Sequence, residues 1–243
     1  MVVESLRRPY RITLPLVALV LLVPLYLFIP QLASGRPPHV PAIALDHRIP
    51  LQPGWVLVYG PLYLFLILLP FFVIRGATPL RQTIHAYLAV WITAYVCFWL
   101  YPTVAPRGEA AVSGEGFAVW GLNFLYSADP PYNCLPSLHV AHSFVSAFSA
   151  YRVHRGLGAA ATACALLVGV STLFTKQHYV LDVAAGFLLA SLACALLFRQ
   201  LPDDAIPEID RRIAPALALV VSAIVLVPAA GYGVLYMLGV EIR

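Results

Sequence analysis

The chain has 243 residues, of which 61% are hydrophobic and only 11% charged, and its formal net charge is +4. A soluble domain carries about 25% charged residues, so this composition excludes an ordinary water-soluble protein. The fifteen lysine and arginine residues are spread singly and form no basic stripe, which excludes nucleic acid as a partner. The composition therefore predicts an all-α, polytopic integral membrane protein.

Seven apolar segments are long enough to cross a hydrocarbon core, which needs roughly 20 residues per helix. They cover about residues 12–31, 54–74, 84–101, 137–153, 158–175, 179–198 and 213–239. The first follows three arginines, as the core of a signal peptide does, but it is longer than such a core and is assigned as a span. Because no linker divides the chain, residues 1–243 are predicted to form a single transmembrane domain.

The basic residues predict the orientation of these spans. With a cytoplasmic amino terminus, ten basic residues lie on the cytoplasmic side and five on the other, which is the expected positive-inside asymmetry. The ten are Arg7, Arg8, Arg11, Arg75, Arg81, Arg152, Arg155, Arg199, Arg211 and Arg212; the five are Arg36, Arg48, Arg107, Lys176 and Arg243. We therefore expect a multi-pass protein of the cell membrane, with the loops near 32–53, 102–136 and 175–179 on the extracytoplasmic face.

Chemically active residues gather at the ends of spans on that face. His178 and Asp182 are four residues apart at a helix start, so the carboxylate can accept a hydrogen bond from the imidazole. This pairing fixes the tautomer and leaves the other ring nitrogen as a base or a nucleophile. A carboxylate at the hydrocarbon edge is costly without such a partner. A polar pair that only braces two helices is the alternative interpretation.

Two further segments favour binding of an anion. Pro136 and Ser137 are typical of a helix start, whose unpaired backbone amides attract phosphate, and His139 in this first turn could protonate an oxygen of the bound group. Arg107 lies in a proline-stiffened loop, where its guanidinium suits bidentate contact with phosphate. Taken singly, these are also features of an ordinary capped helix and of a solvated arginine. The first outer loop, residues 39–48, either contacts a headgroup or is simply solvated.

The order and spacing of these residues resemble the type 2 phosphatidic acid phosphatase superfamily, whose three motifs read roughly K-x6-RP, PSGH and SR-x5-H-x3-D. Residues 136–139, PSLH, match the second motif, and Arg107 remains from the first. The third motif keeps its spacing at Ser171, His178 and Asp182. The resemblance covers about residues 40 to 195 and implies a six-helix phosphatase-like core, to which the last apolar segment adds a seventh transmembrane helix.

The resemblance also implies a mechanism without a metal or a cofactor. His178 would attack phosphorus and form a phosphohistidine, Asp182 would orient it, and His139 would protonate the departing oxygen and then act as a base. The residues implied to surround the phosphate oxygens are Arg107, Lys176, Ser137, Leu138 and Ser171. The substrate would be a lipid phosphate or a phospholipid, with a lipid alcohol or water as the acceptor.

The chain departs from the family pattern at four phosphate-contacting positions. Leu100 replaces the lysine of the first motif and Gly108 its proline, Leu138 replaces the glycine of PSGH, and Thr172 replaces the arginine of the third motif. Lys176, the only lysine in the chain, could supply one of the lost positive charges.

The PSLH tetrapeptide and the TKQHYVLD segment are most similar to the branch of inositol phosphorylceramide synthases and, more distantly, sphingomyelin synthases. Enzymes of that branch move a phospho-headgroup from a glycerophospholipid to a lipid alcohol. We therefore expect a membrane lipid phosphotransferase. A lipid phosphate phosphatase of the same superfamily is the first alternative, and a non-catalytic lipid transporter or scaffold is the second.

A metal site is the remaining alternative, because the chain contains a set of donors of the right type to hold zinc and activate water. These donors are His139, His142, His178 and Asp182. Against this interpretation, a divalent cation would lie beside the positive charges of Arg107 and Lys176, so no metal is predicted.

Overall fold

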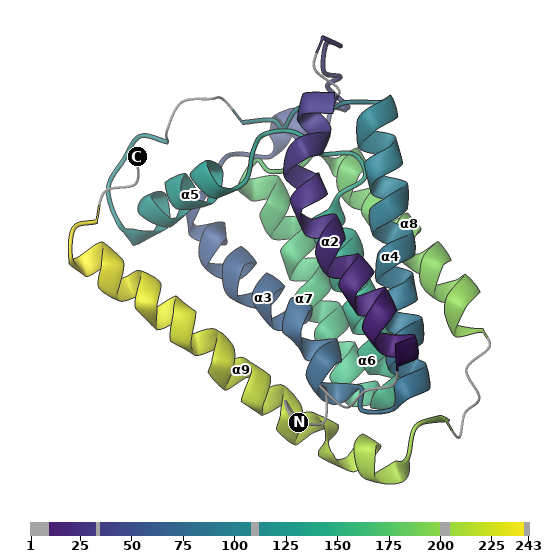
Figure 1. Ribbon diagram of the computed structural model, residues 1–243. Helices are drawn as coiled ribbons and strands as arrows, with labels where there is room; N and C mark the ends of the chain where they lie inside the picture. Colours follow the sequence, from purple (N-terminus) through teal and green to yellow (C-terminus); the bar gives the residue numbers. More distant parts are fainter. Residues whose placement is uncertain (1–9, 33–34, 108–111, 200–204, 241–243) are drawn as a thin grey trace.

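The computed structural model describes residues 10–32, 35–107, 112–199 and 205–240, and Figure 1 shows their arrangement. Apart from two isolated bridges, regular structure in these ranges is helical, which confirms the all-α prediction. The helices are α2 (Tyr10–Leu32), η1 (Asp46–Arg48), η2 (Pro53–Trp55), α3 (Val56–Val73), α4 (Ala77–Leu100), α5 (Phe117–Ala128), α6 (Leu138–Val153), α7 (Arg155–Phe174), α8 (Val180–Phe198) and α9 (Glu208–Met237).

Six helices in the described ranges are long and apolar enough to cross a membrane, namely α2, α3, α4, α7, α8 and α9. The predicted span 137–153 is α6, a helix of only 16 residues that does not belong to this set. Helix α5 was not predicted, because a 12-residue helix fits within the segment 102–136, which we interpreted as a loop. The architecture is therefore that of a polytopic membrane protein with two shorter helices that do not meet the length of a span.

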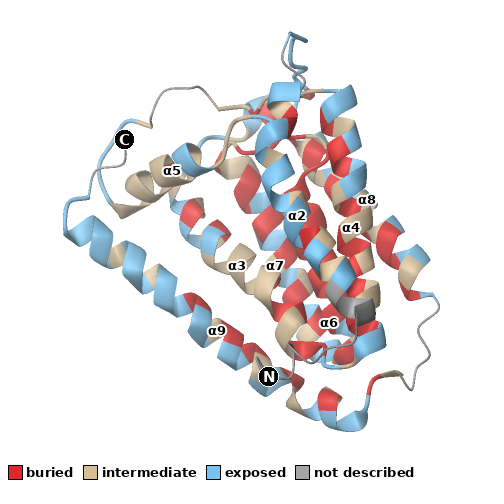
Figure 2. Ribbon diagram, in the orientation of Figure 1, coloured by how far each residue is buried: buried red, intermediate tan, exposed pale blue. Residues whose placement is uncertain are grey.

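Helix α6 lies at the centre of the bundle and packs against α3, α4, α7 and α8. Its buried face carries small polar residues, including Ser143, Ser146 and Ser149. Large apolar side chains instead lie on the outside, for example Leu188 on α8 and Leu219 on α9, which are 57% and 72% exposed (Figure 2). A polar centre with an apolar exterior is the distribution expected of a bundle surrounded by lipid.

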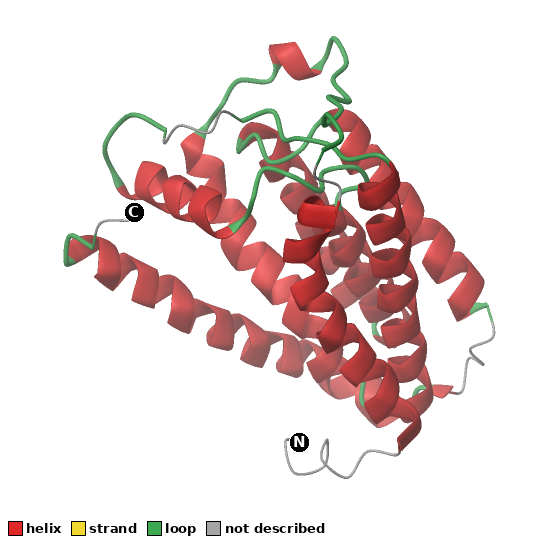
Figure 3. Ribbon diagram, turned by 45° about the horizontal axis from the view of Figure 1, so that its top comes forward, coloured by secondary structure: helices red, strands yellow, loops and turns green. Residues whose placement is uncertain are grey.

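The connecting segments 35–55, 101–107, 112–116, 129–137 and 175–179 gather at one end of the bundle, which we call the loop end (Figure 3). The antiparallel course of α3, α4, α6, α7 and α8 brings them there, as the alternation of predicted spans indicated (Figure 1). The three segments that carry the predicted site residues therefore meet in space.

Backbone hydrogen bonds join these segments to one another. The amide of His39 donates to the carbonyl of Pro102 at 2.7 Å, and the amide of Ala105 donates to the carbonyl of Pro131 at 2.8 Å. The buried hydroxyl oxygen of Thr103 accepts from the amides of Cys134 and Leu135, at 2.9 and 3.1 Å. Thr103 thus holds the segment before α6 against the segment after α4.

The starts of α6 and α8 are in direct backbone contact. The amide of Ser137 donates to the carbonyl of Asp182 at 3.0 Å. Gly186, one turn further along α8, permits this approach, because a Cβ atom there would lie 2.4 Å from the carbonyl oxygen of Ser137. Since such a clash cannot be relieved by a side-chain rotation, the contact requires glycine at this position.

We expect Gly186→Ala to push α8 away from α6 and to lower the free energy of unfolding by about 1–3 kcal/mol, the usual cost of overpacking. Chemical denaturation of the purified protein measures this change. The matched control is Gly169→Ala on α7, where a Cβ atom would meet only ordinary contacts at 3.5 and 3.7 Å. Equal stability of the two variants would contradict the role of Gly186.

Candidate active site

Two histidines from different helices meet at the loop end. Nδ1 of His139, in the first turn of α6, lies 3.0 Å from Nε2 of His178, which precedes α8. The side chain of His139 is 15% exposed and that of His178 only 5%. The pair is therefore mostly withdrawn from solvent, and it places two proton-carrying nitrogens within hydrogen-bond distance of each other.

Asp182 lies on the other side of His178. Its Oδ2 atom is 3.4 Å from Nδ1 of His178, which is an ion-pair distance. The contact does not satisfy hydrogen-bond geometry, so Nδ1 has no hydrogen-bond partner. The same Oδ2 accepts the amide of Tyr179 at 2.8 Å and so caps α8, while the buried Oδ1 has no partner. A small rotation of either side chain would pair Nδ1 with a carboxylate oxygen, a tightening that is common when a ligand binds.

This geometry favours one tautomer of the histidine pair. A proton on Nδ1 of His178 faces the carboxylate of Asp182 and leaves a lone pair on Nε2. Nδ1 of His139 then donates to that lone pair. Nε2 of His178 is thus the nitrogen available as a nucleophile once a ligand displaces His139.

Asp129, at the end of α5, is a residue that sequence reasoning missed. Its Oδ2 lies 4.0 Å from Nε2 of His139, and its Oδ1 accepts the hydroxyl of Tyr26 at 2.9 Å. Burial raises the pKa of this carboxyl, and the hydrogen bond from Tyr26 and the charge of Arg107 oppose that rise. Asp129, His139, His178 and Asp182 consequently form one continuous line of titratable groups.

No motif spacing pointed to Asp129, because it belongs to a segment read as a loop. The available signal was an acid placed ten residues before His139 beside two prolines, in a chain with few acids. That signal alone does not distinguish a buried partner from a solvated charge.

Arg107 reaches the site from the segment after α4. One guanidinium nitrogen, Nη2, donates to the carbonyl of Asp129, and the guanidinium stacks 4.2 Å above the ring of Tyr126. The other nitrogen, Nη1, is buried without a hydrogen-bond partner. A buried, unpaired guanidinium nitrogen is costly unless an anion completes it, so Arg107 is equipped to bind phosphate. The neighbouring Gly108 lies outside the described residues.

The start of α6 has the predicted cap. The side chain of Ser137 accepts the amide of Val140 at 3.3 Å, and both Ser137 and Leu138 are buried. The amides of the first turn have no carbonyl one turn earlier in the helix to which they could donate. They therefore contribute partial positive charge next to His139.

Two of the predicted phosphate ligands are directed elsewhere in the structure. The ammonium of Lys176 donates to the backbone carbonyls of Ile49 and Asp46, at 2.5 and 3.5 Å. The hydroxyl of Ser171 donates to the carbonyl of Val168 within α7 at 2.7 Å. None of these contacts reaches the histidine pair, so the structure brings together His139, His178, Asp182 and Arg107 but not these two side chains.

The first loop is held in place rather than solvated around Asp46. Its carboxylate accepts the amides of Ile43 and Val180, at 2.8 and 2.9 Å, and the residue is only 8% exposed. Asp46 and Lys176 thus cross-connect the first loop to the turn that carries His178. We call this pair of contacts the loop clasp.

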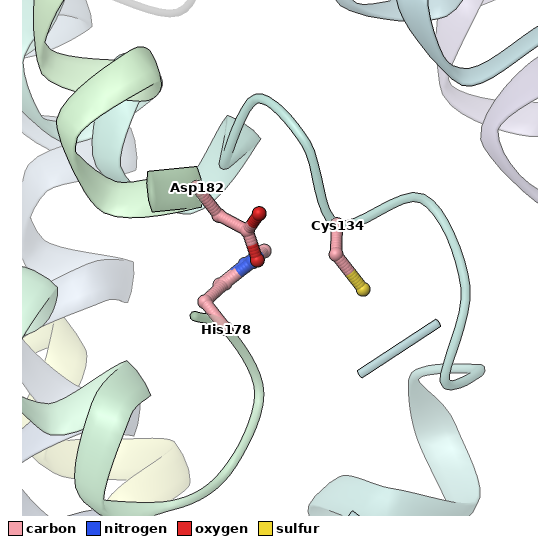
Figure 4. A group of neighbouring side chains, drawn as sticks. All are labelled: Cys134, His178 and Asp182. Atoms are coloured by element: carbon pink, nitrogen blue, oxygen red, sulfur yellow. The ribbon is translucent and has the colours of Figure 1, made fainter. Parts of the chain in front are cut away.

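A thiol lies beside the acid and the histidine. Ligand atoms of Cys134, His178 and Asp182 fall within 4.8 Å of one another, and all three residues are buried. Figure 4 shows the three side chains. Among the described residues this is the group that could hold a metal ion, and it differs from the set weighed from the sequence, which included His142. The ring of His142 instead contacts aromatic residues, at 4.2 Å from the ring of Tyr87.

Comparison with known proteins shows the family to which the chain belongs. The family model described as PAP2 superfamily matches residues 39–196. Over 129 residues, the chain is 26% identical to a PA-phosphatase related-family protein of Dictyostelium discoideum, an alignment that covers 47% of this chain and 23% of that protein. No solved structure matches the chain. The matches extend to the superfamily and do not separate out its inositol phosphorylceramide synthase branch. Because the matched region is well over half of the chain and contains the whole histidine site, the protein belongs to the PAP2 superfamily.

Proposed function

We propose that this protein is a metal-independent membrane lipid phosphotransferase that moves a phospho-headgroup between lipids through a phosphohistidine on His178. The observation that carries the proposal is the direct contact of His139 with His178. Asp129 contacts the other ring nitrogen of His139, and Asp182 contacts the other ring nitrogen of His178. This arrangement provides a nucleophile, an acid–base group beside it, and a carboxylate behind each.

In the first step, Nε2 of His178 attacks phosphorus and the bond from phosphorus to the diacylglycerol oxygen breaks. His139, which carries a proton on each ring nitrogen in this step, donates one of them to that departing oxygen, so diacylglycerol leaves neutral and His139 becomes neutral. Asp182 stabilises the positive charge that develops on the His178 ring. In the second step His139 takes the proton of the acceptor hydroxyl, whose oxygen attacks the phosphohistidine and restores free His178.

The charge on the transferred group is neutralised by the unpaired Nη1 of Arg107 and by the first-turn amides of Leu138 and His139, since the amide of Ser137 donates to the carbonyl of Asp182. Both are fixed before the substrate arrives, which is the condition under which donors stabilise a transition state most. Lys176 takes no part in this scheme, because its ammonium is engaged in the loop clasp.

The choice of acceptor distinguishes a transferase from a phosphatase. His178 and Asp182 are nearly inaccessible to solvent, and the rings of Tyr59 and Tyr63 lie 5.4 and 4.9 Å from that of His139. A site that excludes bulk water favours a lipid hydroxyl over water as the acceptor. Hydrolysis proceeds from the same intermediate and is the alternative outcome of the experiment below.

We further propose that the loop end faces the extracytoplasmic side. More of the described basic residues lie at the opposite end of the bundle than at the loop end. The positive-inside rule places the end richer in basic residues in the cytoplasm. Arg7, Arg8 and Arg243, which also entered the sequence argument, lie outside the described residues.

The proposed activity is tested by incubating the purified protein in nanodiscs with a mixed lipid extract and measuring the products by mass spectrometry. We expect diacylglycerol together with a new phosphodiester. His178→Gln should reduce turnover at least about a thousandfold, as loss of a nucleophile does, while His47→Gln, at an exposed position of the same end, should not. Inorganic phosphate in place of the phosphodiester would establish the phosphatase.

Two results of the same experiment would contradict the proposal. Lipid binding without any product would indicate the transporter or scaffold. Loss of turnover in a chelator, restored by zinc, would indicate that the group at Cys134, His178 and Asp182 holds a metal.

Asp129→Asn should lower kcat by about tenfold to a hundredfold, the range expected for loss of one interaction with a charged group. Burial raises the pKa of Asp129, so its carboxylate gains a proton at a higher pH than an exposed acid does. The ratio of wild-type to variant rate should therefore shrink as the pH falls through that raised pKa, which a pH–rate profile measures. A ratio that does not change with pH would contradict the role, and the control is Glu115→Gln, an exposed acid in the same connecting region.

Substitutions of Lys176 and Arg107 should affect different quantities, the free energy of unfolding for Lys176 and KM for Arg107. Lys176→Met should lower the free energy of unfolding by about 1–2 kcal/mol through loss of the loop clasp, with KM changed less than about twofold. Arg107→Lys keeps the charge but loses the planar fork, so KM should rise about tenfold with stability retained. A large KM increase in Lys176→Met would instead make the lysine a phosphate ligand.

A further inference from the structure

A groove of about 310 Å³ lies between α3, α5 and α9. Its volume is at the lower end of the range, about 300–1,000 Å³, that is typical of small-molecule pockets. Apolar residues from all three helices form its walls, among them Leu57 and Leu64 on α3, Phe124 on α5, and Val225 and Pro228 on α9. We call it the lateral groove.

The lateral groove reaches the candidate active site. Tyr59 lines the groove, and its ring is 5.4 Å from the ring of His139. Ala128 also lines the groove and is the residue immediately before Asp129. One end of the groove therefore adjoins the group that protonates the departing oxygen in the proposed reaction.

The groove also opens to the surroundings of the bundle. Leu57 and Tyr232, on facing walls, are 48% and 37% exposed. These walls belong to α3 and α9, two of the helices that could cross a membrane, so the opening faces lipid. A hydrocarbon chain could consequently occupy the groove while the rest of its lipid remains in the bilayer.

Helix α9 supplies one wall and lies outside the family match, which ends at residue 196. It leaves the bundle at an angle and approaches α5 at the loop end (Figure 1). There the indole nitrogen of Trp120 donates to the carbonyl of Val240 at 2.9 Å, and the rings of Phe124 and Tyr232 pack at 4.9 Å. The α9 wall therefore lies outside the region that the family model matches.

We propose that the lateral groove holds one hydrocarbon chain of the lipid whose phosphate His178 attacks, and that α9 thereby sets the chain length accepted. The proposal rests on the proposed function. A lipid with phosphorus at His178 and its glycerol oxygen near His139 has its chains next to Tyr59, where the groove begins. A mostly apolar wall stabilises such a chain by removing its methylene groups from water.

Two substitutions block the groove with little strain. A Cβ atom at Gly60 meets nothing within 4 Å, so Gly60→Phe fills free space on the α3 wall. Ala229→Phe narrows the groove from the α9 wall. The matched control is Gly231→Phe, on the same helix, where a Cβ atom also meets nothing within 4 Å but the residue does not line the groove.

Binding is tested with phosphatidic acid that carries a diazirine at the end of one acyl chain, in nanodiscs of phosphatidylcholine. After irradiation, mass spectrometry should find labels on groove residues of α3, α5 and α9, removed by excess unlabelled phosphatidic acid. Labelling should persist in His178→Gln, because it requires no turnover. It should fall about tenfold in Gly60→Phe and Ala229→Phe and remain in Gly231→Phe.

Selectivity is tested by diacylglycerol release from dipalmitoyl and dioctanoyl phosphatidic acid. The preference for the longer chains should fall about tenfold in both groove variants, since fewer methylene groups are buried. Three results would overturn the proposal. They are labelling of α2 and α8 as strong as that of the groove, groove labelling that unlabelled phosphatidic acid does not remove, and unchanged chain-length selectivity in the groove variants. Groove labelling in a wild-type protein that releases no product from any lipid would instead contradict the proposed function and leave the groove assignment in place.

Discussion

The backbone contact between the starts of α6 and α8 is the constraint on which the site depends. His139 lies in the first turn of α6 and His178 just before α8, 39 residues further on, so the relative position of these two helix starts sets the 3.0 Å between Nδ1 of His139 and Nε2 of His178. The hydrogen bond from Ser137 to the carbonyl of Asp182 fixes that position, and the missing side chain at Gly186 allows it. The geometry of the candidate site is thus a consequence of how closely two backbones can approach.

Burial determines how the polar groups of the site act on one another. In a low-dielectric setting each charged group needs a partner. Asp182 contacts His178, Asp129 contacts His139, and Arg107 donates to the backbone carbonyl of Asp129. Three buried atoms of this group have no hydrogen-bond partner, namely Nη1 of Arg107, Nδ1 of His178 and Oδ1 of Asp182. A bound anion would accept from Nη1 of Arg107, and a small rotation would pair Nδ1 of His178 with the carboxylate of Asp182.

The elements outside the superfamily motifs have separate functions in the structure. The loop clasp of Asp46 and Lys176 holds the turn that carries His178, although the lysine resembled a replacement for a lost phosphate ligand. Helix α5 brings Asp129 to the site and closes one side of the lateral groove with α9. These contacts therefore involve residues that the motifs do not describe.

By itself the sequence determined the all-helical membrane architecture, because the length and hydropathy of each apolar segment decide whether it can leave water. It also predicted that His178 and Asp182 are neighbours, which lie 3.4 Å apart, but not their geometry, because His178 precedes α8 and its Nδ1 has no hydrogen-bond partner. Only the tertiary structure decided the partner of His139, the engagement of Lys176 and the presence of Asp129, because these contacts join segments far apart in the chain. Their geometry follows from the packing of whole helices, which no local spacing encodes.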